Sequence, residues 1–272
     1  GLAAAQQLGR AGHEVHVYER ETKAGGLLRY GIPDFKMEKN FIDRRVEQMK
    51  GENVTFHCGV NVGVDVTVET LRADYDAVLY CGGSETPREA GIPGVEFHGV
   101  HDAMPYLVQQ NRRVGREDID SVGWPSDPIL AGGKHVVVVG GGDTASDCVG
   151  TAFRQGAVKV TQLDIRPRPP QTEDKLAIWP FWATKMRTSS SQAEGAEREF
   201  QVATLEFIGE DTIKHTPKDE AVRVKLTADV VPDPKTGQIQ RTVKDILDPY
   251  QIGFSPNQKW FVSASLRLDR VD

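Results

Sequence analysis

The stretch His135-Val-Val-Val-Val-Gly-Gly-Gly-Asp-Thr-Ala145 decides the fold of this chain. Its four consecutive valines are typical of a strand that a parallel sheet buries on both faces. Gly140, Gly142 and Ala145 then give a G-x-G-x-x-A turn, and the residues up to Arg154 predict a helix. The first glycine permits a sharp bend, the second lets backbone approach a pyrophosphate, and the small third residue lets helix and strand pack closely. The free N–H groups of the helix start favour phosphate, so the stretch predicts a dinucleotide site.

A second strand is predicted over Val158–Asp164, and it ends on an acid nineteen residues after Ala145. That spacing is close to the one expected for a carboxylate that binds an adenosine ribose. Arg166 and Arg168 flank the end of this strand. Arginines there are solvated charges by default, but they are also placed to meet a ribose 2′-phosphate.

The start of the chain repeats the same layout. Gly1 opens into a predicted helix over Leu2–Leu8, and an alternating strand over His13–Glu19 again ends on an acid, eighteen residues after the glycine. We therefore interpret Gly1 as the last glycine of a second dinucleotide fingerprint whose first strand and first two glycines lie upstream. The alternative is a capped surface helix followed by an incidental strand.

The next segments continue an α/β pattern. A glycine-rich loop over Lys23–Lys36 would let backbone run close to a bulky ligand, and an amphipathic helix is predicted over Phe41–Lys50. Two short strands are expected within Val54–Val66, and a buried strand over Asp76–Gly83 ends in glycines at the ligand edge of the sheet. Cys81 is expected to serve packing rather than chemistry, because no base or second thiol lies near it in the sequence.

Composition excludes several classes of function. The 272 residues carry a formal net charge of −6 with scattered basic residues, which implies no general affinity for nucleic acid. The sequence has no run of eighteen apolar residues, so no membrane span is expected. The three cysteines lie far apart without metal-site spacing, which fits a reducing cytosol and a cytoplasmic location. His98 and His101 lack an evident third ligand, so no metal site is predicted.

Four motifs together resemble one family. They are the run Gly25–Lys39 after Glu19, the run Gly99–Met104, the run Gly140–Gly150 and the run Val160–Pro170. This set is similar to the small (beta) subunit of glutamate synthase, and the match covers roughly residues 1–182. The family belongs with flavoproteins that carry one FAD domain and one NAD(P) domain. The upstream iron–sulfur cysteines of the family are absent from this sequence, and so is its C-terminal Gly-Asp segment that closes over the flavin.

The resemblance implies a role for each matching residue. Glu19 would hold the FAD ribose, and Asp164, Ile165 and Arg166 would surround the adenosine end of NADPH or NADH. The remaining flavin-site residues are Gly1, Arg20, Gly25, Gly26, Leu27, Lys36, Val62, Cys81, Gly82 and Gly83. The remaining residues of the nicotinamide nucleotide site are Gly140, Gly141, Gly142, Asp143, Thr144 and Ala145.

The resemblance also implies an activity, which is NAD(P)H oxidation. Hydride would pass from the nicotinamide to FAD, and the electrons would serve glutamate synthesis from glutamine and 2-oxoglutarate on a large partner subunit. No catalytic side chain is expected, because the cofactors carry the chemistry. One alternative is a related flavin reductase that feeds ferredoxin or a pyrimidine-reducing domain. Another is a non-catalytic nucleotide-binding module.

The predicted fold is α/β, with two Rossmann-like dinucleotide-binding domains of parallel sheets, the first lacking its opening strand. The FAD domain is expected over residues 1–120 and the NAD(P) domain over 121–272, joined near 105–130. From about residue 210 the chain matches no known pattern, apart from one plausible strand from Trp260. We expect an internal fragment that holds FAD poorly, with iron–sulfur clusters only in the upstream region. The Trp179–Trp182 cluster is expected to pack, and Ser189–Ser191 to form a flexible loop.

Overall fold

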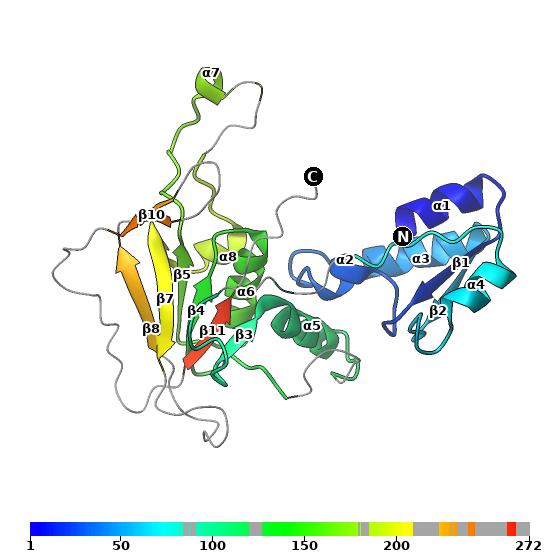
Figure 1. Cartoon of the computed structure of the whole chain (residues 1–272), viewed down its shortest axis with the longest axis horizontal. Coiled ribbons are helices and arrows are strands. Elements are labelled where there is room, and N and C mark those ends of the chain that lie inside the picture. Colours follow the sequence, from blue (N-terminus) through cyan, green and yellow to red (C-terminus); the bar gives the residue numbers. More distant parts are fainter. Residues whose placement is uncertain are drawn as a thin grey trace. The chain divides into compact units, whose positions relative to one another are not determined.

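The structure is a computed structural model, and Figure 1 shows the whole chain. It divides into two compact units, one of residues 1–86 and 107–128 and one of residues 87–106 and 129–272. The residues that the structure describes are 1–83, 87, 91–119, 127–178, 180, 185–208, 223–228, 230–232, 239–242 and 260–264. The first unit is called unit 1 below, and the second unit 2.

Unit 1 is built around two parallel strands. Strand β1 (Val15–Glu19) pairs along its whole length with β2 (Val54–Cys58). Helices α1 (Leu2–Arg10) and α3 (Asn40–Gly51) pack against these strands, because both helices are amphipathic. Ala5, Met49 and Val54 form the buried centre of this packing. The predicted first helix, first strand and amphipathic helix are therefore all present.

The region after β2 has less strand than the sequence predicts. Residues 54–66 contain β2 and then only an isolated bridge between Val62 and Val66, rather than two strands. Helix α4 (Val68–Asp74) follows, and the Thr67 hydroxyl caps it by accepting a hydrogen bond from the backbone N–H of Thr70. Helix α2 (Gly26–Tyr30) lies within the glycine-rich loop.

The strand predicted over Asp76–Gly83 does not form, and that prediction is wrong for this structure. The segment has no regular secondary structure and is exposed, with Leu79 64% and Tyr80 87% accessible, and Cys81 is exposed rather than packed. A strand needs a neighbour for its backbone groups. Among the described residues of unit 1, β1 and β2 pair only with each other, so residues 76–83 have no strand to pair with.

A buried ion pair stabilises the remainder of unit 1. Helix α5 (Ala103–Val114) carries Arg112, whose guanidinium donates to the carboxylate of Glu21 and stacks over the Tyr30 ring at 4.9 Å. The Arg112 side chain is 1% exposed. Because removing one partner of such a pair leaves a buried charge uncompensated, the pair fixes the loop after β1 against the end of α5.

Unit 2 contains a parallel sheet in the order β3-β11-β4-β5-β6. Its strands are β3 (Val100–Asp102), β4 (His135–Val139), β5 (Lys159–Asp164), β6 (Glu197–Phe200) and β11 (Trp260–Ala264). Strand β11 comes from the tail that the sequence left unassigned, and it lies between β3 and β4 (Figure 1). The single strand predicted from Trp260 is thus present and lies inside the sheet.

The described part of unit 2 contains further helices and two antiparallel strand pairs. The helices are α6 (Asp143–Arg154), α7 (Lys175–Ile178) and α8 (Ser190–Ala193). Antiparallel pairs are formed by β7 (Val202–Ile208) with β8 (Arg223–Ala228) and by β9 (Val230–Pro232) with β10 (Ile239–Thr242). The α/β class with parallel sheets that the sequence predicts is confirmed.

The valine run behaves as its composition predicts. Val136, Val137 and Val138 are all at most 4% exposed, and Val137 packs with Leu163 and Phe207 in the core of unit 2. Consecutive buried residues on both faces require cover on each side of the strand; α6 packs on the sheet, and Phe207 of β7 packs against Val137. The long apolar run therefore fixes β4 as an interior strand.

Ser189–Ser191 is not a loop, which corrects the sequence prediction. The Ser189 hydroxyl accepts from the backbone N–H of Gln192, and the Gln192 amide oxygen accepts from the backbone N–H of Ser189. This reciprocal capping box starts α8. Trp179, Phe181 and Trp182 of the predicted aromatic cluster lie outside the described residues.

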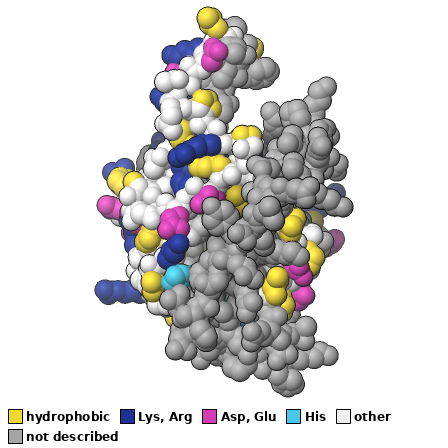
Figure 2. Space-filling model, turned by 90° about the vertical axis from the view of Figure 1, so that its left-hand side faces the viewer, with side chains coloured by type: hydrophobic (Ala, Val, Ile, Leu, Met, Phe, Trp, Pro, Cys, Tyr) yellow, Lys and Arg dark blue, Asp and Glu magenta, His cyan; other side chains and the backbone are white. Residues whose placement is uncertain are grey.

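None of the described helices is long and apolar enough to cross a membrane. On the face that Figure 2 shows, basic and acidic side chains of the described residues are interspersed.

The titration of His101 on β3 gives a prediction about stability. Burial, with smaller contributions from His98 and Lys134, lowers the pKa of His101 to about 4. The unfolded chain, with a histidine pKa of about 6.5, then binds more protons than the folded chain, so stability falls as pH falls through this window. Between pH 7 and pH 5 the loss from this one group is up to about 2 kcal/mol.

Urea unfolding of the wild type and of His101→Gln at both pH values measures this contribution. The variant is expected to lose less stability than the wild type on acidification. His98→Gln, which replaces the exposed neighbour, is the matched control and should keep most of the wild-type pH dependence. Equal pH dependence of His101→Gln and the wild type would contradict the assignment.

Candidate functional site

The glycine turn after β4 is held at its first residue. Gly140 has φ +131°, in the region that favours glycine. Its backbone N–H donates to the Leu163 carbonyl at 2.8 Å, and its carbonyl accepts from Nε2 of Gln162 at 2.9 Å. Both partners lie on β5, so the bend is anchored to the neighbouring strand.

The second glycine of the turn is the most constrained. A Cβ added at Gly141 would lie 1.7 Å from Oδ2 of Asp164 and 2.9 Å from Nη2 of Arg166. Any side chain at position 141 would require the buried Asp164 carboxylate to move, so glycine lets the pair of Asp164 and Arg166 keep its place. The fingerprint pattern treats position 141 as variable, so the sequence predicted the need for glycine at 140 and 142 and missed the stronger one at 141.

Gly142, unlike Gly141, has no neighbouring atoms that would exclude a side chain. A Cβ added there would meet no atom within 4 Å, and its φ of −86° and ψ of −173° are open to any residue. Gly142 is the N-cap of α6, without a side-chain cap. Since the first N–H groups of a helix have no partner within the helix, the start of α6 over Asp143, Thr144 and Ala145 offers donors and a positive dipole end beside open space.

Ala145 explains how α6 reaches this position. The residue is fully buried, as are its successors along the inner side of α6. A small side chain here lets the first turn of the helix lie close to β4 and β5, as the third position of the fingerprint requires.

The acid at the end of β5 is paired. The carboxylate of Asp164 accepts from the Arg166 backbone N–H at 3.0 Å and from its guanidinium Nε and Nη2 at 3.1 and 3.0 Å. The Asp164 side chain is 9% exposed and that of Arg166 43%. Asp164, predicted to bind a ribose, and Arg166, predicted to meet a 2′-phosphate, thus form one bidentate pair, next to the exposed Ile165.

Two further arginines lie near this pair, and the sequence did not point to one of them. Arg168 and Arg198 place their guanidinium groups 5.6 and 5.0 Å from the centre of the Phe200 ring. Burial and the charge of Arg168 lower the pKa of Arg198, while Asp164 opposes the shift. Arg198 and Phe200 lie on β6, so only the order of the strands brings them to Asp164.

In unit 1 the structure brings together two distant flavin-site candidates. A Cβ added at Gly1, the N-cap of α1, would lie 3.6 Å from Cβ of Cys81. Gly82 and Gly83 follow, and Gly83 has φ +74°. The start of α1 therefore lies beside the segment that the sequence predicted to approach the flavin.

The other flavin-site candidates lie after β1 and in the glycine-rich loop. Glu19 ends β1, and its carboxylate accepts from the backbone N–H of Glu21 at 3.0 Å. Arg20 approaches the carboxylate of Glu21 at 3.5 Å. Gly25 has φ +140° and packs against Arg29 and Ile42, so it is fixed as glycine.

The last four candidates are less enclosed. Gly26 begins α2 with φ +51°, and Leu27 after it is 49% exposed. Lys36 is exposed and its backbone N–H closes a turn onto the Pro33 carbonyl at 3.0 Å. Val62 is 39% exposed beside its bridge to Val66.

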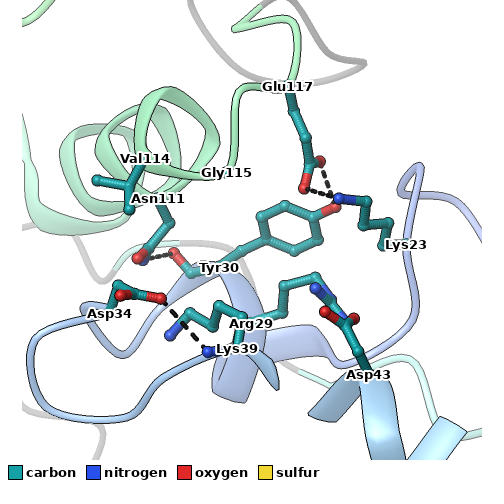
Figure 3. A pocket seen from close by; sticks show the side chains of 10 residues that line it. All are labelled: Lys23, Arg29, Tyr30, Asp34, Lys39, Asp43, Asn111, Val114, Gly115 and Glu117. Carbon is teal, nitrogen blue, oxygen red and sulfur yellow. Dashed lines mark hydrogen bonds and ion pairs between the residues drawn. The ribbon is translucent and has the colours of Figure 1, made fainter. Parts of the chain in front are cut away.

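A small cavity of about 160 Å³ lies within unit 1, between the glycine-rich loop and the end of α5 (Figure 3). Polar side chains that line the cavity form ion pairs and hydrogen bonds with one another. The Glu117 carboxylate accepts from Lys23 and Tyr30, and Arg29 donates to Asp43. Burial is the main cause that raises the pKa of Tyr30 above its usual range. These pairs mark the cavity as a structural cluster.

Comparison with known proteins identifies the family. The model of the pyridine nucleotide-disulphide oxidoreductases matches residues 1–231. A YNCE-like beta-propeller model matches residues 210–272, less than a quarter of the 272-residue chain, which does not assign a second family.

Several relatives are named as glutamate synthases. The small chain of the NADPH enzyme from Mycobacterium tuberculosis H37Rv is 54% identical over 212 residues, which is 78% of this chain and 43% of the relative. The small chain from Azospirillum brasilense is 35% identical over 94% of this chain and 51% of its own length. This chain therefore spans less than half of the first relative and about half of the second. The resemblance predicted from the motifs is confirmed.

Solved structures support the fold. Mycobacterium tuberculosis FprA in complex with NADPH matches 97% of this chain and 67% of its own length, with a TM-score of 0.62 and 16% sequence identity. At this identity the match concerns the fold alone. From the family match over residues 1–231 and these relatives, the chain belongs to the pyridine nucleotide-disulphide oxidoreductase family.

Proposed function

We propose that this chain is part of a flavin-dependent NAD(P)H oxidoreductase, with the nicotinamide nucleotide bound to unit 2 and FAD to unit 1. The observation that carries the proposal is the turn from β4 to α6. The Gly141 backbone lies close to the Asp164 carboxylate, whereas an added Cβ at Gly142, the N-cap of α6, would meet no atom within 4 Å. This combination fits a pyrophosphate, which needs close backbone and free N–H groups.

Each group of residues near the turn is proposed to bind one part of the nucleotide. Gly140, Gly141 and Gly142 with Asp143, Thr144 and Ala145 would hold the pyrophosphate through the start of α6. Asp164 would accept from a ribose hydroxyl, and Arg166 would contact a 2′-phosphate, with Ile165 beside the adenosine. Because Arg166 is the more exposed partner of the pair, it is free to turn toward a phosphate while Asp164 stays in place.

For FAD, the start of α1 beside Cys81 is the corresponding feature. Glu19 at the end of β1 would bind the ribose, in the position that Asp164 has at the end of β5. The other proposed flavin contacts are Gly1, Arg20, Gly25, Gly26, Leu27, Lys36, Val62, Cys81, Gly82 and Gly83. The division of the two cofactors between residues 1–120 and 121–272 stays a prediction.

When bound, the nicotinamide supplies a hydride and the flavin accepts it. The residues of this chain bind and orient the two cofactors, and the glycines let their backbone come close. No side chain of the chain is assigned a proton transfer.

The electrons are proposed to serve glutamate synthesis on a large partner subunit, through centres outside residues 1–272, in the cytoplasm. Support comes from the names of the relatives, including a glutamate synthase [NADH] of Saccharomyces cerevisiae at 38% identity. A related reductase is the alternative, since the putative oxidoreductase AegA of Escherichia coli is 39% identical over 74% of this chain. A flavin spectrum with NAD(P)H-dependent dye reduction separates either enzyme from a non-catalytic nucleotide-binding module.

Gly142→Val tests the nucleotide site directly. The φ and ψ of Gly142 suit valine and the space beside it is open, so the variant is expected to fold. Its branched side chain would occupy the place of the pyrophosphate. Affinity for NADPH and NADH, measured by calorimetry, should fall more than tenfold, a loss of at least ~1.4 kcal/mol.

Gly51→Val is the matched control for this substitution. An added Cβ at Gly51 also meets no atom within 4 Å, its φ is not in the left-handed region, and it lies in unit 1. This variant should bind the nucleotide as the wild type does. Unchanged affinity in Gly142→Val would remove the site from the proposal.

Arg166→Ala tests the choice of coenzyme. A guanidinium binds a 2′-phosphate through two charge-assisted hydrogen bonds, whereas an unpaired Asp164 carboxylate would repel it. The variant should therefore lower the ratio of NADPH to NADH affinity by about tenfold. Binding titrations with both coenzymes measure the ratio. If it does not fall, the phosphate is read elsewhere, and Arg168 is the next residue to replace.

A further inference from the structure

A chain of hydrogen bonds runs behind the glycine turn, from the start of α8 to the end of β4. Its members are Ser189, Gln192, Gln162 and Gly140, all in unit 2. Figure 1 shows α8 next to α6 and the sheet, and α6 and α8 pack together.

The three bonds have ordinary lengths, and the bond between the two glutamines is buried. The Ser189 backbone N–H donates to Oε1 of Gln192 at 2.9 Å. Nε2 of Gln192 donates to Oε1 of Gln162 at 2.8 Å, and Nε2 of Gln162 donates to the Gly140 carbonyl at 2.9 Å. The residues Gln162 and Gln192 are 1% and 7% exposed.

The direction of this relay is fixed by chemistry at both ends. A backbone N–H can only donate, so it sets the amide of Gln192 with its oxygen toward Ser189. A backbone carbonyl can only accept, so it sets the amide of Gln162 with its nitrogen toward Gly140. The bond between the two glutamines then has one possible sense. Each amide therefore supports the orientation of the other.

The relay acts on the peptide that begins the turn. The Gly140 N–H is bound to Leu163, and the Gly140 carbonyl is bound to Gln162. In a trans peptide the N–H points opposite to the carbonyl, so the bond from Gln162 directs the Gly141 N–H away from β5. Without a donor at Gln162, the Gly140 carbonyl would lose its partner, and the turn would no longer be held at its bend.

We propose that Gln162 and Gln192 are positioning residues for the nicotinamide nucleotide. They hold the Gly140–Gly141 peptide in the orientation in which the turn receives the pyrophosphate. This inference rests on the proposed function, because it concerns the same turn. It adds that α8, a short helix distant in sequence from the glycine turn, influences the affinity of that turn for the nucleotide.

Gln192→Glu separates this role from a purely structural one. A Ser-x-x-Glu sequence is as good a capping box as Ser-x-x-Gln, so α8 should remain capped. The buried carboxylate lowers the stability of the fold at neutral pH, so binding is compared only where the variant is folded. The introduced carboxylate has no hydrogen to donate to Gln162. The Gln162 amide would then turn its nitrogen toward the carboxylate and its oxygen toward the Gly140 carbonyl, which repels it.

Calorimetric titration of the folded protein with NADPH and with NADH is the measurement. At about pH 8, and at a temperature well below its unfolding transition, the Gln192→Glu variant should bind its preferred coenzyme about tenfold more weakly than the wild type. As the pH falls from about 8 to about 6, its affinity should recover toward the wild-type value, because the protonated carboxyl donates again.

Ala193→Glu is the matched control for charge. Ala193 is exposed on the same helix and outside the relay, so this variant adds the same charge and should bind as the wild type at every pH. If Gln192→Glu does not fold, Gln192→Leu removes the donor without a buried charge. It should weaken binding with no recovery at lower pH.

The outcomes distinguish this inference from the proposed function. If the wild type binds neither coenzyme, the proposed function fails, and the positioning role fails with it. If the wild type binds and a folded Gln192→Glu or Gln192→Leu variant binds equally well, the relay is only structural and the inference is overturned.

Discussion

The close approach of the Gly141 backbone to the Asp164 carboxylate is the constraint on which the rest of the site depends. An added Cβ would lie 1.7 Å from the carboxylate, so the turn after β4 and the end of β5 meet without a side chain between them. The neighbouring Gly142, at the start of α6, has free space beside it, and Asp164 lies next to Gly141 in the same turn. The buried valines of β4 and the small Ala145 bring the strand and the helix to this point.

Local signals in the sequence predicted much of this arrangement. The valine run, the glycine spacing and the acid after the second strand each act over a few residues, and β4, α6 and β5 form as they indicate. The same reasoning found α1, β1 and α3. The Ser189-x-x-Gln192 capping box was also readable, but the serine run was taken for a loop.

The failures concern features that depend on distant neighbours. Residues 76–83 have the composition of a buried strand, yet a strand forms only where another strand offers its backbone groups. The position of β11 between β3 and β4, and of Arg198 next to Asp164, follows from sheet order, which local patterns do not encode. Gly141 was undervalued because its constraint is a contact with β5 rather than a property of its own turn.

The most direct test of the central claim is a crystal structure of the protein with NADP⁺ or NAD⁺ bound. The account predicts the pyrophosphate at the start of α6, against Gly142 and within hydrogen-bond distance of the first N–H groups of the helix. It also predicts the adenosine ribose next to Asp164. A nucleotide bound with its pyrophosphate away from α6, while the turn at Gly140–Gly142 keeps the conformation described above, would contradict it.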